Sequence, residues 1–276
     1  MTGARVPRAS TPRMGALVAL VLAVVAASAA EDVGTGQQVI RKDDKVLDET
    51  GLVLENAWLR AVIADNEYAG QVMHLVYKPT GQDLAPAKDP QGYFTDRMGE
   101  DRYFWSGKSR DYAGQLLGSG DGQVQARITY TWDYDYHGKQ TTVAVSKTFT
   151  LRKGEAALRL DWELTNTGKT AVAMTPWVKH VGGQSEGLLG GPTRAVTAAG
   201  AVDLAPNSFN SAARDWMARL SGRVTTEQAA MVVSVIGFTQ TFQHFPWQGK
   251  DRYTLETILR QVTLEPGRSW KAHCVL

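Results

Sequence analysis

The stretch "VSKTFTLRKGEAALRLDWELTNTGKTAVAMTPWVKH", residues 145–180, decides the fold class of this chain. In its middle, residues 156–166 alternate strictly, with Leu158, Leu160, Trp162 and Leu164 at every second position. The intervening positions carry polar residues such as Asp161. Side chains alternate between the two faces of a β-strand, so this pattern predicts a half-buried antiparallel strand.

Similar strand signals recur along the rest of the chain, and helical periodicity is nearly absent. "HGKQ", residues 137–140, separates two such runs and is suited to a hairpin connection. "TTEQAA", residues 225–230, is the best candidate for a short helical turn, and the glycine-rich residues 181–192 are expected to form a loop. The further predicted strands are residues 52–64, 70–77, 122–136, 141–151, 215–221, 229–238, 240–245, 252–264 and 269–276.

No low-complexity linker and no repeat of about 20 to 50 residues interrupts residues 31–276. We therefore expect one all-β domain over residues 31–276, built from two large antiparallel sheets packed face to face. A domain of this length exceeds an immunoglobulin-like sandwich of about 100 residues.

The first 30 residues have the pattern of a secretory signal peptide. Three arginines and no acid precede an uncharged run from Met14 to Ala30, and Ala27-Ser28-Ala29 fits a small-residue cleavage site. The alternative is a retained membrane anchor, although the run is short for a bilayer span of about 20 residues. We expect cleavage, a secreted or periplasmic location, and no stable membrane insertion of the mature chain.

Charge and cysteine content narrow the functional classes. Without the three leader arginines the formal charge is 27 − 28 = −1, and no cluster of lysine and arginine remains. This excludes the basic face of a nucleic-acid-binding protein, so no nucleic-acid partner is expected. Cys274 is the only cysteine, so no disulfide can form within the chain, and its apolar neighbours predict a buried side chain.

The sequence shows no motif for a metal or a cofactor. The five histidines are dispersed without the close spacing of metal ligands, and phosphate-binding and dinucleotide-binding motifs are missing. We therefore expect neither a metal nor a cofactor.

Three segments resemble the galactose mutarotase-like β-supersandwich superfamily. "GLVLENAWLRAVIADNEYAGQVMHLVYKPTGQDL" is similar to its opening strands, the stretch quoted first is similar to its central hairpin with "ltNtg", and "YTLETILRQVTLEPGRSWKAHCVL" is similar to its final strands. The resemblance spans almost all of residues 31–276 and implies the same fold. The superfamily includes aldose epimerases, domains of polysaccharide lyases and glycoside hydrolases, and proteins that only bind glycans, so function must come from the site.

The resemblance also implies a catalytic pair. It places the acid that protonates a sugar ring oxygen at His180, and the base that deprotonates the anomeric hydroxyl at Glu256. A histidine and an ionised glutamate suit these roles at neutral pH. However, Val181-Gly182-Gly183 replaces the "YFN"-like sequence that commonly follows the histidine, and Glu256 lies only ten residues before Pro266. Both departures count against mutarotase activity, and the first favours a glycan-binding protein without the chemistry.

The residues themselves leave a second interpretation open for each member of the pair. On a regular strand, His180 shares a face with Val172, Met174 and Val178, which predicts a core histidine. Glu256 shares its face with Ile258 and Arg260 and could simply pair with Arg260.

Two further stretches mix aromatic and charged residues in a way that suits a sugar ligand. Guanidinium groups can bind hydroxyls or carboxylates, and aromatic rings can stack on a pyranose. The alternative for both stretches is a surface loop with salt bridges. The candidate ligand-binding residues are Arg97, Arg102 and Trp105 in residues 92–107, and His244, Trp247 and Arg252 in residues 242–253.

These observations indicate a carbohydrate ligand. The first hypothesis is a sugar epimerase-like or lyase-like enzyme that uses His180 and Glu256. The second is a non-catalytic glycan-binding protein of the same fold, and the third is a structural β-domain without a polar cleft.

The leader pattern yields the first testable prediction. N-terminal sequencing of exported material should begin near Ala30 or Glu31, because the small-residue motif at residues 27–29 directs cleavage there. An intact Met1 in the membrane fraction would contradict this and identify an anchor.

Overall fold

The computed structural model describes residues 33–42, 45–68, 70–85, 92–99, 107–136, 139–183, 188–197, 200–211, 216–224, 229–238, 241–249 and 252–276. All of them belong to one compact unit, Asp32–Leu276. The predicted signal peptide lies outside the described residues. Within these ranges there is no helix long and apolar enough to cross a membrane.

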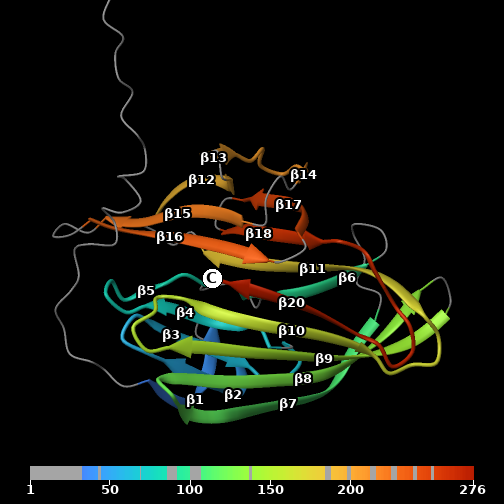
Figure 1. Cartoon of the computed structure of the whole chain (residues 1–276). Coiled ribbons are helices and arrows are strands. Elements are labelled where there is room, and N and C mark those ends of the chain that lie inside the picture. Colours follow the sequence, from blue (N-terminus) through green and yellow to red (C-terminus); the bar gives the residue numbers. More distant parts are fainter. Residues whose placement is uncertain are drawn as a thin grey trace, which may run out of the picture. The chain divides into compact units, whose positions relative to one another are not determined.

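The described strands form three antiparallel sheets (Figure 1). The first sheet has the order β1 (Gly34–Lys42), β2 (Lys45–Glu55), β3 (Leu59–Ala64), β4 (Val72–Tyr77), β5 (Gln82–Asp83). The second has the order β13 (Gly200–Asp203), β12 (Leu188–Thr197), β15 (Trp216–Val224), β16 (Ala229–Phe238), β20 (Ser269–Val275), β10 (Leu158–Asn166), β9 (Lys139–Arg152), β8 (Gln123–Tyr136), β7 (Gly107–Gly120). The third has the order β14 (Asn210–Ser211), β17 (Thr241–Gln248), β18 (Arg252–Leu259), β11 (Val172–Gly183), β19 (Val262–Leu264), with β6 (Thr95–Gly99) also paired to β11.

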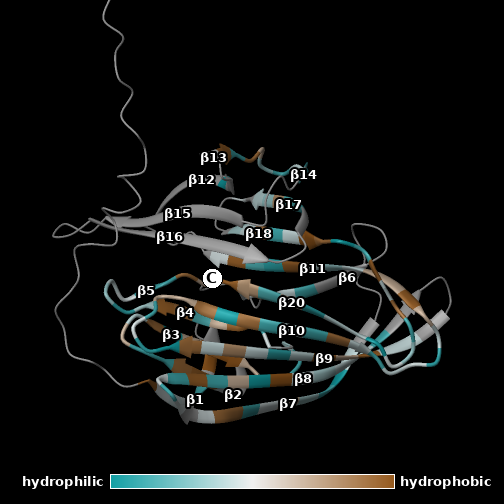
Figure 2. Cartoon of the chain, viewed as in Figure 1, coloured by the Kyte–Doolittle hydropathy of each residue, from teal (hydrophilic) through white to brown (hydrophobic). Residues whose placement is uncertain are grey.

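The all-β, antiparallel fold class is confirmed, and the strands divide into three sheets where the sequence indicated two. The stretch quoted first becomes β9, β10 and β11. The expected hairpin pairs β8 with β9, with Tyr136 opposite Lys139, so the second half of residues 137–140 already belongs to β9. Figure 2 shows alternating hydrophobic and hydrophilic bands along β8 to β10. On β10 the buried positions are the predicted Leu158, Leu160, Trp162 and Leu164.

Three local predictions need correction. The expected loop at residues 181–192 is strand at both ends, because β11 continues to Gly183 and β12 begins at Leu188. The expected helical turn at residues 225–230 ends in strand, since β16 begins at Ala229. Part of the aromatic and charged stretch 92–107 is strand β6 and not a loop.

Two buried asparagines, Asn56 and Asn166, hold turns that lie within the segments resembling the superfamily. Asn56 accepts from the backbone N–H groups of Trp58 and Leu59 and donates to the carbonyls of Arg152 and Glu155, which joins the β2–β3 turn to the β9–β10 turn. A buried amide that satisfies several backbone groups at once is costly to replace.

Asn166 does the same where β10 ends. Its Nδ2 donates to the carbonyls of Thr170 and Leu264, and its Oδ1 accepts from Gly168 N–H and the Thr141 hydroxyl. Its own backbone N–H donates to the Arg268 carbonyl. One side chain therefore ties the β10–β11 turn to the β19–β20 turn.

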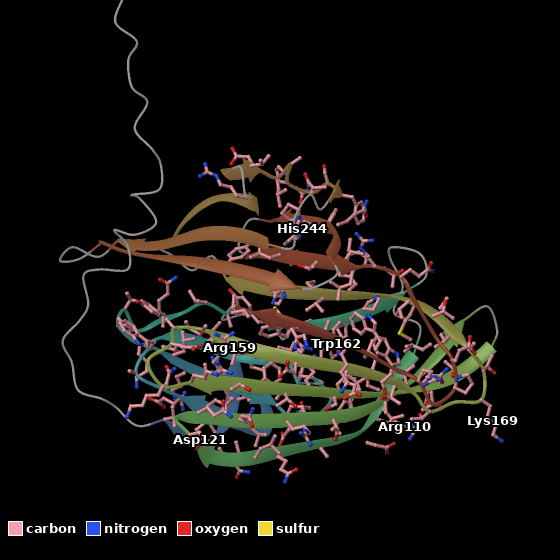
Figure 3. All side chains as sticks on the ribbon, viewed as in Figure 1. Arg110, Asp121, Arg159, Trp162, Lys169 and His244 are labelled. Atoms are coloured by element: carbon pink, nitrogen blue, oxygen red, sulfur yellow. The ribbon has the colours of Figure 1, made fainter. Side chains whose placement is uncertain are left out.

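The main hydrophobic core draws on all three sheets, as shown by buried Leu54 on β2, Phe149 on β9 and Leu255 on β18. Trp162, labelled in Figure 3, lies inside it. Its ring meets that of Trp270 edge to face, with centroids 5.5 Å apart. The predicted burial of Cys274 is confirmed.

Replacement of Asn166 tests its role as a clamp. Asn166→Ala should lower the free energy of unfolding by about 3 kcal/mol, because the buried Leu264 carbonyl and the partly buried Thr170 carbonyl lose the amide donor and the Thr141 hydroxyl loses an acceptor. Urea denaturation measures this. Asn66→Ala is the control, because half-buried Asn66 accepts one bond from Tyr68 N–H and should cost less than about 1 kcal/mol. Equal losses in the two variants would contradict the clamp.

Candidate functional site

The ladder between β11 and β18 determines what each face of the third sheet presents. Its register runs without a bulge from Trp177 opposite Ile258 to Gly183 opposite Arg252. Side chains alternate along both strands, so each ladder pair belongs to one face. We call the side that joins the main core the core face; it carries Val178 and Leu255. The opposite side is the outer face.

His180 lies on the core face, opposite Leu255, with no exposed surface. The Phe94 backbone N–H donates to its Nδ1 over 3.4 Å, and the Tyr93 and Phe94 rings lie 5.8 and 4.7 Å from its ring centroid. Burial, with the nearby Lys147 charge, lowers the pKa of His180 to about 3. The imidazole is therefore neutral at ordinary pH and cannot begin a reaction as a charged acid.

A buried ion pair lies beside His180. Lys147 Nζ on β9 is 2.8 Å from Asp96 Oδ1 on β6 and donates to the Phe94 carbonyl over 2.7 Å. The Tyr130 hydroxyl on β8 donates to the other Asp96 oxygen. Burial raises the pKa of Asp96 and lowers that of Lys147, and each charge opposes the effect of burial on its partner.

These contacts hold the turn that leads into β6. Phe94 has a φ of 60°, a left-handed conformation that is unusual for a bulky residue. Its N–H donates to His180 and its carbonyl accepts from Lys147, so both backbone groups are fixed from the core face. His180 thus has a structural role at this turn.

Lys147 was not among the predicted site residues, although the sequence contains a signal for it. On β9 the buried positions run Val143, Val145, Lys147, Phe149 and Leu151, so a lysine occupies a place where the alternation requires an apolar residue. A charge at such a position needs a buried partner of opposite sign. Asp96 had no comparable signal, because it stood among several charged residues.

The outer face carries a second pair of opposite charges. Lys179 is opposite Glu256 in the β11–β18 ladder, and the two side chains are 8 % and 4 % exposed. The Thr254 hydroxyl, two residues before Glu256 on the same strand, donates to Glu256 Oε1 over 2.7 Å. The carboxylate, the ammonium group and the hydroxyl therefore share one face.

Aromatic side chains border this pair. Phe245 on β17 is opposite Glu256, and its ring centroid lies 4.7 Å from that of Phe209. Phe209 also meets Trp177 on β11, with centroids 6.2 Å apart. Trp247 is opposite Thr254 and packs over Gly249, where an added methyl carbon would lie 2.4 Å from Trp247 Cη2. Phe245 and Trp247 are only half buried.

The structure does not bring the two predicted catalytic residues together. His180 and Glu256 lie on neighbouring strands, but their register positions differ by one, which places them on opposite faces. The two residues therefore do not share one face of the β11–β18 ladder, as a single pocket with an acid and a base would require. The surroundings of His180 are those that the core interpretation predicts. Arg260, the alternative partner of Glu256, is exposed and lies beyond the end of β18.

Of the four predicted ligand-binding residues that the structure describes, three occupy ladder positions on the outer face and one lies on the core face. His244 is fully buried on the core face of β17, opposite Thr257 (Figure 3), whereas Trp247 is on the outer face. Arg97 is opposite Trp177 in the β6–β11 ladder, and Arg252 is opposite Gly183. Arg102 and Trp105 lie outside the described residues.

Chemically, the outer face places a buried carboxylate and a buried ammonium group at opposed ladder positions, near aromatic rings. Such a combination can bind a molecule that has hydroxyl groups along its edge and C–H groups on its face. Lys179 is a poor acid for reversible proton transfer near neutral pH, since the pKa of a free lysine is about 10.4.

Comparison with known proteins identifies the fold. No protein-family model matches this sequence, and no curated protein matches it. Among solved structures, a candidate aldose 1-epimerase from Klebsiella pneumoniae superposes with a TM-score of 0.54 at 11 % identity, over 90 % of this chain and 84 % of that protein.

Two further similar structures are galactose mutarotase-like proteins. The one from Clostridium acetobutylicum has a TM-score of 0.49 at 9 % identity, over 89 % of this chain and 99 % of its own. The one from Lactobacillus casei has a TM-score of 0.47 at 13 % identity, over 82 % and 99 %. The chain has the galactose mutarotase-like fold, and identities this low establish nothing finer.

The buried ion pair yields a prediction on stability. Lys147→Met and Asp96→Leu should each lower the free energy of unfolding by about 3 to 5 kcal/mol, because each leaves an uncompensated buried charge. The double variant should lose less than either single variant, since no charge is then stranded. Urea denaturation of all four proteins measures the cycle, and losses that simply add would contradict a coupled pair.

Proposed function

We propose that this chain is an exported carbohydrate-binding protein, with its ligand on the outer face of β17, β18, β11 and β6. The observation that carries the proposal is the Lys179–Glu256 pair beside half-buried aromatic rings on the outer face. Sugar hydroxyls would donate to Glu256 and accept from Lys179, while the pyranose face would stack on Trp247 or Phe245. Support from the fold is by analogy, since the neighbour from Klebsiella pneumoniae carries the name of an aldose 1-epimerase.

The positions of the candidate acid and base favour sugar binding over epimerisation. Ring opening needs an acid and a base that reach one sugar from opposite sides. The histidine that the resemblance assigned as the acid faces the core with a pKa of about 3, while Glu256 lies on the opposite face of the sheet. Glu256 therefore acts in this proposal as a hydrogen-bond acceptor.

The aromatic contact gives the direct test of the site. Trp247→Ala should weaken binding to a sugar from a panel of neutral and uronate mono- and oligosaccharides by about tenfold or more, a loss of about 1.4 kcal/mol. Isothermal titration calorimetry measures the affinity. The melting temperature should change little, because Trp247 is half buried and outside the main core.

Trp58→Ala is the matched control. Trp58 is also partly buried, but it lies in the β2–β3 turn of the first sheet and packs against the main core. This variant should lose stability and keep its affinity for the sugar. The proposal fails if no sugar in the panel binds, or if Trp58→Ala and Trp247→Ala weaken binding equally. Interconversion of anomers by the wild-type protein would instead restore the enzymatic hypothesis.

A further inference from the structure

We propose that residues 205–209, in the connection between β13 and β14, form a flap over the outer face of the third sheet, and that Phe209 closes this flap. The connection leads from the second sheet to the third (Figure 1). The covering role of the flap is argued from ring contacts and burial. Its control of ligand entry rests on the proposed function, because it concerns the same face.

The Phe209 ring lies across strand β18. Its centroid is 6.2 Å from that of Trp177 on β11 and 4.7 Å from that of Phe245 on β17. These two strands flank β18 in the sheet, and neighbouring strands are about 4.8 Å apart. Trp177 and Phe245 both occupy outer-face positions, so a ring that contacts both lies between them, over the outer face of β18.

The positions of β18 between these two contacts are buried, although they are on the face opposite to the main core. Ile258 is the ladder partner of Trp177, and Glu256 is the ladder partner of Phe245. Both side chains are 4 % exposed, whereas Phe209 is only half buried. The ring therefore lies between this part of β18 and the solvent, and a ligand that reaches Glu256 across it has to displace it.

One side chain supports the flap from within. Asn210 Oδ1 accepts from the Ala205 N–H, and Asn210 Nδ2 donates to the carbonyls of Ala205 and Ser208. The Ser208 hydroxyl donates to the Pro206 carbonyl. Residues 205–208 are exposed, so these local bonds, and not burial, give the flap its shape.

The flap has fixed ends and a contact in its middle that can open. Leu204, just before it, is buried in the main core, and β14, just after it, pairs with β17. Between these ends the Asn207 N–H donates to the Pro246 carbonyl over 2.7 Å. A compact loop that meets the sheet through a backbone bond and an aromatic ring can swing about its two ends, as flaps over binding sites do.

Thiol labelling measures the cover without any ligand. Ile258→Cys places a thiol on the outer face of β18, Leu255→Cys places one on the core face, and the parent chain gives the background from buried Cys274. A methanethiosulfonate reagent should modify Ile258→Cys about tenfold faster or more when Phe209→Ala is added, because the local opening that exposes the thiol is then easier. The labelling of Leu255→Cys should stay unchanged.

Asn210→Ala tests the flap without removing the ring. It takes away the internal support and keeps Phe209, so it should also speed the labelling of Ile258→Cys. Asn66→Ala is the matched control, because half-buried Asn66 supports a turn in the first sheet and should leave the rate unchanged. If Phe209→Ala does not fold, Asn210→Ala decides the question alone.

Two labelling results exclude the flap. If neither Phe209→Ala nor Asn210→Ala changes the rate for Ile258→Cys, the ring does not control access to β18. If the rates for Ile258→Cys and Leu255→Cys rise by the same factor, the ring stabilises the whole fold and covers no particular face.

Sugar binding is the second measurement, on the same panel of neutral and uronate saccharides. Phe209→Ala should bind the sugar about threefold more tightly or better than the wild type, because the open, binding-competent state is then populated without displacement of the ring. A sugar that stacks on Phe209 would instead lose affinity in this variant, and that result overturns the flap.

The flap and the proposed function fail in different ways. If no sugar in the panel binds while the labelling rates change as expected, the proposed function fails and the flap stands. If a sugar binds and Trp247→Ala weakens its binding, while labelling is insensitive to Phe209→Ala and Asn210→Ala, the proposed function stands and the flap fails.

Discussion

The unbroken register between β11 and β18 is the constraint on which the rest of this molecule depends. It fixes which side chains of the third sheet enter the main core and which lie on the opposite, outer face. One set builds the packing of His180, Phe94 and the Lys147–Asp96 pair. The other set places Lys179 and Glu256 beside aromatic rings. A shift of the β11–β18 register by one residue would therefore exchange the structural set and the proposed functional set between the two faces.

The alternation on the central strands was strong enough to predict the fold class from sequence. Leu158 through Leu164 lie buried as expected, and the asparagines of the two turn motifs prove to be clamps that join distant turns. The glycine-rich segment after His180 was less informative, because glycine is common in loops but does not prevent pairing in strands such as β11 and β12. Nothing in the local sequence separated a third sheet from the second.

The candidate site was only partly predictable, for a physical reason. Sequence alone could place Glu256 on a strand, but the residue opposite it depends on register, which is set by the whole sheet. The resemblance selected His180, and the ladder places Lys179 there instead. The buried charge at Lys147 was visible as a break in an apolar alternation, whereas its partner Asp96 was one acid among several in a charged stretch.

The core face uses its polar groups to secure β6 and the Phe94 turn, and the ligand site that we propose uses the polar groups of the outer face. The central claim is that Lys179, and not His180, lies beside Glu256. Disulfide formation tests it directly, since opposed strand positions have Cα atoms about 4.5 to 5.5 Å apart, within the range that a disulfide spans. Native Cys274 is buried and does not compete. We expect that Lys179→Cys/Glu256→Cys cross-links on mild oxidation while His180→Cys/Glu256→Cys remains reduced, and the opposite result would contradict the claim.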